Sequence, residues 1–206
     1  MRRYYWKWIE GEKVDYLSKF SVAVVGSRML LNLLWRMGIG CIRYISDFVT
    51  PNDVLIDATL HPLEASCYDI VHPYSEESCI ISYFYPEDVS ELRKLLRGID
   101  VVVAHRHIEE VAEVAEKIGA PFIPNIVTTF LPDGVQFSEV TLPSVEYDPI
   151  SYAITCSVQA AEILKILTGY DLPVIAPEAI LVDLRAEGYL RKIELVRKDG
   201  LREART

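Results

Sequence analysis

Residues 22–31, Val-Ala-Val-Val-Gly-Ser-Arg-Met-Leu-Leu, decide the fold of this chain. Four apolar residues, three of them β-branched valines, are typical of a buried parallel strand. Gly26 ends that strand and a helix-like run follows, which is the local architecture that binds phosphate through backbone N–H groups. Only the first glycine of the pattern G-x-G-x-x-G is present, and Arg28 and Met29 replace small residues. The stretch predicts a nucleotide-binding scaffold with altered chemistry.

The composition indicates a single globular domain over residues 1–206. Half of the residues are hydrophobic and a quarter are charged, and the formal net charge is −9. This charge disfavours nonspecific binding to nucleic acid or to an anionic membrane. No apolar stretch approaches the ~20 residues that span a bilayer, and no signal-peptide pattern follows the basic N-terminus. We therefore expect a cytoplasmic protein with neither nucleic acid nor membrane as its partner.

The four cysteines form no recognisable metal or disulfide pattern. They are spread along the chain without a C-x-x-C pair, at Cys41, Cys67, Cys79 and Cys156. That spacing argues against a zinc knuckle and against a disulfide framework. The sequence thus predicts no metal-ligating residues.

Strands and helices are predicted to alternate along the chain, which indicates an α/β fold with a doubly wound, mostly parallel sheet. An N-terminal helix is expected within residues 1–20, at about 3–19. The expected strands are 22–25, 41–46, 79–84, 100–104 and 121–126, with a short one at 54–56 inside an irregular stretch. The expected helices are 28–37, 86–97, 107–118 and 151–168. Residues 127–147 and 179–198 are expected to be β-rich additions, the latter a C-terminal antiparallel hairpin around Glu187-Gly188.

Polar residues follow several of these strands. They are Gly26-Ser27-Arg28, Asp47, His105-Arg106-His107 and Asn125 with Thr128. In doubly wound folds, ligands bind at the carboxyl ends of the strands. We therefore expect these residues to converge on one crevice.

Five segments, in order, resemble the E1-like (ThiF/MoeB/HesA) adenylyltransferases, whose fold is Rossmann-like. Gly38-Ile-Gly40 followed by 41–47 resembles the family's "AGVGRIGLVD", and 100–107 lies where the family has "DVVVDATDN". The most specific match is 156–169, Cys-Ser-Val-Gln-Ala-Ala-Glu-Ile-Leu-Lys-Ile-Leu-Thr-Gly, which is close to "GSLQALEAIKLLTG". The first of these matches begins at 22–26, before the helix that leads to Gly38, and the two remaining matches are 119–124 and the hairpin 181–195.

The resemblance implies an enzyme that activates a carboxylate with ATP and Mg²⁺ and that works as a homodimer. Among small, divergent members, the chain is similar to those of guanylylpyridinol (iron-hydrogenase) cofactor biosynthesis. That similarity implies adenylation of the pyridinol's carboxylate, so that a partner protein can capture it through a thiol. The chain lacks the family's zinc-binding C-x-x-C pairs, and His107 replaces the family's magnesium-binding aspartate, so the ligands of Mg²⁺ are left open.

Four places in the chain are candidates for contacting the nucleotide. Gly26 and Ser27 offer a backbone turn, although a plain structural turn is the alternative. Arg28 could replace lost backbone contacts by bidentate phosphate contacts, or be a surface residue. Asp47 lies where ribose hydroxyls bind in this kind of fold, or it is a turn residue. Arg3 lies where the family's N-terminal helix reaches the neighbouring subunit's ATP site.

His105, Arg106 and His107 are candidates for a platform that binds the triphosphate. Together with Arg28, Arg106 and His107 form the predicted catalytic set, while His107 could instead simply begin a helix. The predicted substrate-binding residues are Asn125, Thr128, Thr129 and Tyr152. The first three could hydrogen-bond a heteroaromatic substrate or only satisfy loop groups.

Two other functions stay open. The altered glycine turn and the missing metal aspartate also fit a catalytically silent E1-like scaffold that binds a partner protein. An NAD-dependent oxidoreductase shares the fold, but the phosphate turn is blocked and no suitable Tyr-x-x-x-Lys is present.

Overall fold

A computed structural model describes residues 17–48, 69–71, 79–184 and 189–198. Its centre is a six-stranded sheet in the order β3-β4-β2-β1-β5-β6, in which all neighbours are parallel except β3 and β4. The predicted doubly wound α/β fold is confirmed. The strands are β1 (Ser21–Val25), β2 (Cys41–Ser46), β3 (Asp69–Val71), β4 (Cys79–Phe84), β5 (Val101–Ala104) and β6 (Phe122–Ile123).

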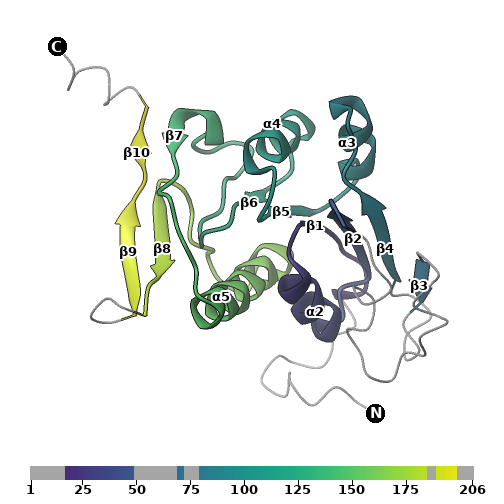
Figure 1. Ribbon diagram of the computed structural model, residues 1–206, viewed down its shortest axis with the longest axis horizontal. Helices are drawn as coiled ribbons and strands as arrows, with labels where there is room; N and C mark the ends of the chain where they lie inside the picture. Colours follow the sequence, from purple (N-terminus) through teal and green to yellow (C-terminus); the bar gives the residue numbers. More distant parts are fainter. Residues whose placement is uncertain (1–16, 49–68, 72–78, 185–188, 199–206) are drawn as a thin grey trace.

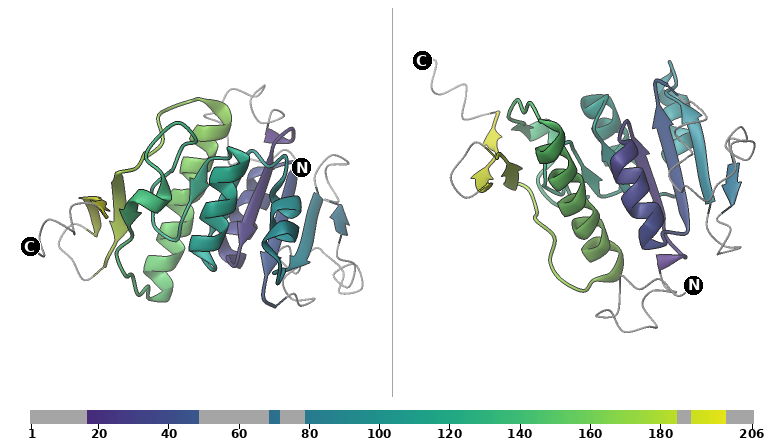
Figure 2. Two further views of the ribbon diagram at one scale, coloured as in Figure 1. Left: turned by 90° about the horizontal axis from the view of Figure 1, so that it is seen from above. Right: turned by 60° about the horizontal axis from the view of Figure 1, so that its bottom comes forward.

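Helices cover both faces of this sheet. α2 (Arg28–Met37) and α5 (Pro149–Thr168) lie on one face, and α3 (Val89–Leu96) and α4 (Ile108–Ile118) on the other (Figure 1; Figure 2). Successive side chains of a strand point to opposite faces. Val22 and Val24 accordingly pack with the first helix pair, while Ala23 and Val25 pack with the second. Burial on both faces explains why β1 is apolar throughout.

The chain approaches itself closely at Gly40, just before β2. A Cβ placed there would lie 1.7 Å from the carbonyl oxygen of Ser18. The Gly40 N–H donates to the carbonyl of Leu17 at 3.1 Å. This position therefore requires glycine because no side chain fits between the two backbones.

Most predicted element boundaries are confirmed, with shifts at two helix starts. α3 begins at Val89 because the Asp88 carboxylate caps it, accepting from the Ser90 N–H. α5 begins at Pro149, two residues earlier than predicted, because Asp148 accepts from the N–H groups of Ile150 and Ser151. Side-chain capping of the first free amides sets both starts.

Other parts of the prediction need correction. β6 has only two residues because the flanking Pro121 and Pro124 have no N–H to donate to a ladder. The antiparallel edge strand β3 was not predicted. Residues 127–147 are less regular than expected, with a 3-10 turn η5 (Phe137–Glu139) and a short β7 (Val140–Thr141). Residues 3–16 of the predicted N-terminal helix and the strand at 54–56 fall outside the described residues.

The C-terminal hairpin is confirmed. β8 (Glu178–Val182) pairs antiparallel with β9 (Leu190–Glu194), and β10 (Val196–Arg197) pairs with β7. This hairpin lies on the side of β6 (Figure 1). The described parts of both β-rich additions thus extend the fold beyond the same edge of the sheet.

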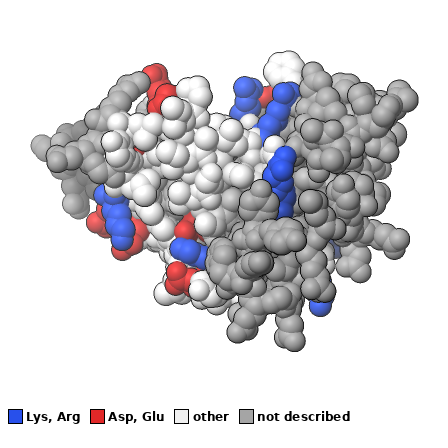
Figure 3. All heavy atoms as spheres, turned by 90° about the horizontal axis from the view of Figure 1, so that it is seen from below, with Lys and Arg blue, Asp and Glu red and all other residues white. Residues whose placement is uncertain are grey.

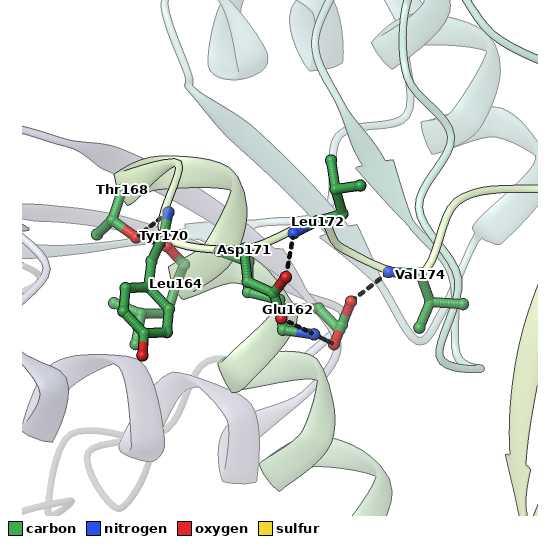
Figure 4. Close-up of polar contacts among 8 residues, drawn as sticks. Glu162, Leu164, Thr168, Tyr170, Asp171, Leu172 and Val174 are labelled. Atoms are coloured by element: carbon green, nitrogen blue, oxygen red, sulfur yellow. Dashed lines mark hydrogen bonds and ion pairs between the residues drawn. The ribbon is translucent and has the colours of Figure 1, made fainter.

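A buried carboxylate holds the segment after α5 in place. Glu162 is 4% exposed, receives an ion-pair hydrogen bond from Lys165 at 2.9 Å and accepts from the Val174 N–H (Figure 4). Lys165 also lies 3.8 Å from the Asp171 carboxylate. These contacts fix the path from α5 to β8.

The sequence analysis expected no apolar stretch long enough to span a bilayer, and α5 is an exception. By length and composition alone it is apolar enough to cross a bilayer. It nevertheless packs against α2 and β5, and half of its most apolar window is buried. The helix therefore serves as a core helix of the α/β fold.

Candidate functional site

The carboxyl ends of neighbouring parallel strands bring the predicted site residues together. Asp47 follows β2, while Arg106 and His107 follow β5. The Asp47 carboxylate accepts from Arg106 Nη1 at 2.9 Å and from His107 Nε2 at 2.7 Å. We call these three residues the Asp47 cluster. Both carboxylate oxygens are occupied, one by each partner.

Arg106 also covers the glycine turn. Gly26 has φ +76°, and a Cβ on it would lie 2.7 Å from Cγ of Arg106. The stem of Arg106 thus packs on Gly26 while its guanidinium reaches Asp47. A nucleotide in this fold would need the turn after β1 and the acidic residue after β2. Arg106 covers both of them.

His107 is held in an unusual conformation. Its φ of 51° places it in the left-handed region, at the residue that precedes α4, and its ring stacks on Tyr85 with 3.7 Å between centroids. A non-glycine residue in this region is uncommon, and such strain is often stored at functional sites. Tyr85 was missed by the sequence analysis. Its position directly after the strand 79–84 was the available signal.

The cluster keeps Asp47 ionised. The hydrogen bond from His107 lowers the pKa of Asp47 below its usual 3.8, and the hydrogen bond from Arg106 adds to this effect against the opposing effect of burial. An ionised carboxylate that accepts two hydrogen bonds is a strong acceptor. A ribose diol would have to displace at least one of these donors.

A second group of polar side chains lies behind the turn, around His105. Tyr152 Oη lies 2.7 Å from Ser27 Oγ and 3.1 Å from His105 Nδ1. His105 Nε2 lies 2.8 Å from Gln159 Oε1, and the Gln159 amide donates to the carbonyls of Pro124 and Ile126. We call this series the Ser27–Gln159 chain. Gln159 was also missed, although it lies inside the best-matched motif.

The donor directions in this chain follow from its last member. Because the Gln159 NH₂ donates to two carbonyls, its Oε1 must accept the N–H of His105 Nε2. Burial lowers the pKa of His105 to about 4, so the ring is neutral and Nδ1 is an acceptor. Nδ1 then accepts from the Tyr152 hydroxyl, which in turn accepts from Ser27. The chain ties α2, β5 and α5 together beneath the glycine turn.

Several predicted ligands lie in the interior instead of at the crevice surface. His105 is neutral and engaged within the Ser27–Gln159 chain, so it differs from the cationic platform expected from the sequence. Thr128 is buried, and its hydroxyl donates to the Glu178 carbonyl at 2.7 Å. Thr129 is fully buried, and its hydroxyl has no hydrogen-bond partner within the described part of the chain. This placement leaves both threonines away from the crevice.

The other predicted residues are placed as follows. Arg28 is exposed at the first position of α2, directly after the Ser27 N-cap. Asn125 is partly exposed beyond β6, and its carbonyl accepts from the Tyr147 hydroxyl. Arg3 falls outside the described residues. Arg28 therefore shares the carboxyl edge with the Asp47 cluster.

The described residues do not fit a Mg²⁺ ion held by the protein. Among them, no three His, Cys, Asp or Glu side chains gather in a group that could hold a metal. Mg²⁺ prefers oxygen ligands, whereas Asp47 is surrounded by an arginine and a histidine.

The fold is similar to that of several solved structures. PaaA matches with a TM-score of 0.65 and 18% identity over 90% of this chain, and E. coli MccB with a TM-score of 0.63 and 14% identity over 90%. MccB with ATP matches with 0.62 and 15% identity over 90%. No protein-family model matches the sequence, and no curated protein matches it either.

These similarities concern only part of the compared proteins. The chain spans 66% of the length of PaaA and 65% of that of MccB. At such low identity, a structural match establishes the fold and leaves activity to be argued from the site. The chain has a Rossmann-like α/β fold, with PaaA and MccB among its structural neighbours.

Proposed function

We propose that this protein is an ATP-dependent adenylyltransferase that activates a carboxylate. The observation that carries the proposal is the pairing of Asp47 with Arg106, whose stem covers Gly26. Asp47 offers two acceptor oxygens for a ribose diol. Arg106, once displaced from Asp47, is a guanidinium beside a phosphate-binding turn. The structural neighbour MccB, which was also solved with ATP, supports the choice of nucleotide.

The chemistry asks the protein mainly to position two anions and to offset their charge. A carboxylate oxygen attacks the α-phosphorus of ATP, the bond to the bridging oxygen breaks, and pyrophosphate leaves. Donors aimed at the developing charge account for most of the acceleration in such transfers. Arg28, Arg106 and His107 are the proposed donors, and Mg²⁺ would arrive with the nucleotide's phosphates.

The substrate and acceptor are more specific proposals. The missing zinc motif and the divergent glycine turn support guanylylpyridinol as the carboxylate substrate. A thiol of a partner protein would then attack the carbonyl carbon of the acyl-adenylate, releasing AMP and forming a thioester. We propose a cytoplasmic location as well.

We also propose that the protein works as a homodimer. The outward side of α5 has no charged residue between Pro149 and Ala161, and it exposes Ile150, Ser157 and Ala161. Figure 3 shows this side of the molecule, and the described residues in its centre are mostly uncharged. Two copies with a formal net charge of −9 each repel one another, so a self-paired face should be neutral.

The same Arg106 contact favours a second candidate, a silent scaffold. If Arg106 never leaves Gly26 and Asp47, the crevice stays closed to nucleotide. The protein would then bind a partner without consuming ATP.

Titration calorimetry with ATP separates the two candidates. The enzyme should bind ATP and catalyse ATP–pyrophosphate exchange in the presence of a suitable carboxylic acid. Asp47→Ala should weaken adenosine binding about tenfold, the loss of roughly one charge-assisted contact pair. Asp133→Ala, which removes an exposed turn carboxylate, is the matched control. Absence of ATP heat from the wild type would favour the scaffold.

A further inference from the structure

The Ser27–Gln159 chain joins two loops at the carboxyl edge of the sheet. One end is Ser27, in the turn between β1 and α2, and the other is Gln159, which binds the loop after β6. In the sheet order, β5 lies between β1 and β6, and the residue after β5, His105, is in the middle of the chain. The chain therefore runs along the edge past three neighbouring strands.

At the first end of the chain, Ser27 is held from two sides. Its side chain is fully buried, and its Oγ accepts from the Leu30 N–H at 3.4 Å as the N-cap of α2. Its hydroxyl donates to Tyr152 Oη at 2.7 Å. Because one torsion angle places a serine Oγ, these two partners fix the side chain in one rotamer. The backbone turn that would receive a phosphate is directly attached to this fixed side chain.

At the second end, the bonds of Gln159 require an amide group. The side chain is fully buried, its NH₂ donates to the carbonyls of Pro124 at 2.7 Å and Ile126 at 3.2 Å, and its Oε1 accepts from His105. A carboxylate has no N–H to donate, and an aliphatic side chain has no polar atom, so neither can make this set of bonds. The two carbonyls flank Asn125. Gln159 therefore fixes the loop on which Asn125 lies.

The proposed function assigns different parts of the edge to the two reactants. A nucleotide would place its ribose at Asp47, after β2, and its phosphates at the turn after β1. Because the sheet order is β2-β1-β5-β6, the edge beyond β5 and β6 is left for the acid, and Asn125 is partly exposed there. Attack on the α-phosphorus then requires a fixed separation between the turn and the loop after β6.

We infer that Tyr152 and Gln159 are positioning residues, which set the separation between the nucleotide turn and the loop that faces the acid. The inference rests on the proposed adenylyltransferase function and adds how its two reactants are aligned. The two side chains act through the backbones that they hold, without touching the reacting atoms. Alignment matters because a misplacement of about 1 Å can lower a rate about 100-fold.

Tyr152→Phe tests the inference with a small change. It keeps the ring and removes the hydroxyl that bridges Ser27 and His105. Gln159→Leu breaks the chain at its other end, and the double variant combines the two changes. Tyr189→Phe is the matched control, because it removes a hydroxyl from an exposed ring outside the chain. Urea unfolding gives the folded fraction of each variant.

The assay is ATP–pyrophosphate exchange with a hydroxypyridine carboxylate, benzoate and a free heptapeptide, followed with each acid that the wild type accepts. We expect kcat per folded protein to fall about tenfold or more in each single variant, while the KM for ATP stays within about threefold because the turn itself is unchanged. The double variant should be no slower than the slower single variant, because the same chain is already broken. The control should stay within about twofold of the wild type in both parameters.

The results that overturn the inference differ from those that overturn the function. An unchanged kcat in both single variants would show that the chain aligns nothing, and a raised KM for ATP at unchanged kcat would limit its role to the nucleotide site. Losses that multiply in the double variant would show that the two residues act separately. Each of these results overturns the inference while wild-type exchange still supports the proposed function. A wild type with neither ATP heat nor exchange would refute both.

Discussion

At the scale of single residues, Arg106 makes two contacts that both oppose nucleotide binding. Its stem occupies the space above Gly26, and its guanidinium neutralises Asp47. Both contacts must break before a nucleotide can use the turn and the acid. Arg106 is exposed and Asp47 is partly exposed, so breaking their ion pair costs little free energy.

Arg106→Ala should therefore have opposite effects on binding and on catalysis. Adenosine, which has no phosphates, should bind several-fold more tightly because the turn and Asp47 are uncovered. The exchange rate should fall by about 100-fold because a donor to the developing charge is lost. Calorimetry with adenosine and the exchange assay measure the two effects.

Arg93→Ala serves as the control because it removes the same charge from the exposed side of α3. A parallel loss of adenosine affinity and exchange in Arg106→Ala would contradict the covering role of this residue. It would indicate that Arg106 only supports the local structure.

His105 should make the folded state sensitive to acid. Burial lowers its pKa from 6.5 to about 4, so the unfolded chain binds more protons between these values. Stability is then fully present above pH 6.5 and is lost as the pH falls toward 4. The loss at this residue should approach about 3 kcal/mol.

Urea unfolding across this pH range measures the effect. His105→Phe should be less stable at neutral pH, because Tyr152 and Gln159 lose a partner, but its stability should depend less on pH. An equally steep pH dependence in this variant would assign the acid sensitivity to other groups.

At the scale of elements, the junction between α2 and β2 depends on a close backbone contact. Gly40→Ala should destabilise the fold by about 3 kcal/mol or more, because its Cβ would meet the Ser18 carbonyl, which cannot rotate away. Gly134→Ala is the matched control, since its nearest neighbour would lie at an ordinary 3.4 Å. Equal denaturation midpoints for the two variants would show that Ser18 can move aside.

The anchor at the end of α5 should also be costly to remove. Glu162→Ala leaves the Val174 N–H without its acceptor and Lys165 without its closest partner, so we expect a loss of about 1–3 kcal/mol. Glu113→Ala breaks an exposed ion pair with Lys117 on α4 and should cost less than about 0.5 kcal/mol. Urea unfolding of the two variants compares them, and similar losses would argue against a special role for Glu162.

At the scale of the whole molecule, the uncharged side of α5 should decide the oligomeric state. Ala161→Glu places a carboxylate on this side, where two copies would bring like charges together, and should shift a dimer to monomer. Ser138→Glu adds the same charge to the segment before β7 and should leave the dimer intact. Light scattering during size-exclusion chromatography measures the mass, and a wild-type monomer would refute the proposal.

The sequence predicted most accurately those features that depend on residues close together along the chain. The boundaries of α2 and β2 follow from apolar periodicity and capping residues, and these interactions involve neighbours along the chain. The parallel sheet follows from the alternation of strands and helices. The predicted crevice residues Asp47, Arg106 and His107 were correctly expected to converge because they follow parallel strands.

Only the tertiary structure decided how those residues are used. Arg106 covers Gly26, His105 hydrogen-bonds Gln159 as a neutral ring, and Thr128 faces the interior. Each of these arrangements depends on packing between segments that are distant in sequence. The order of strands and helices along the sequence determined which residues lie at the carboxyl edge of the sheet. Whether a side chain there faces solvent or the interior was set by contacts across the fold, because burial and hydrogen-bond partners are properties of the packed molecule.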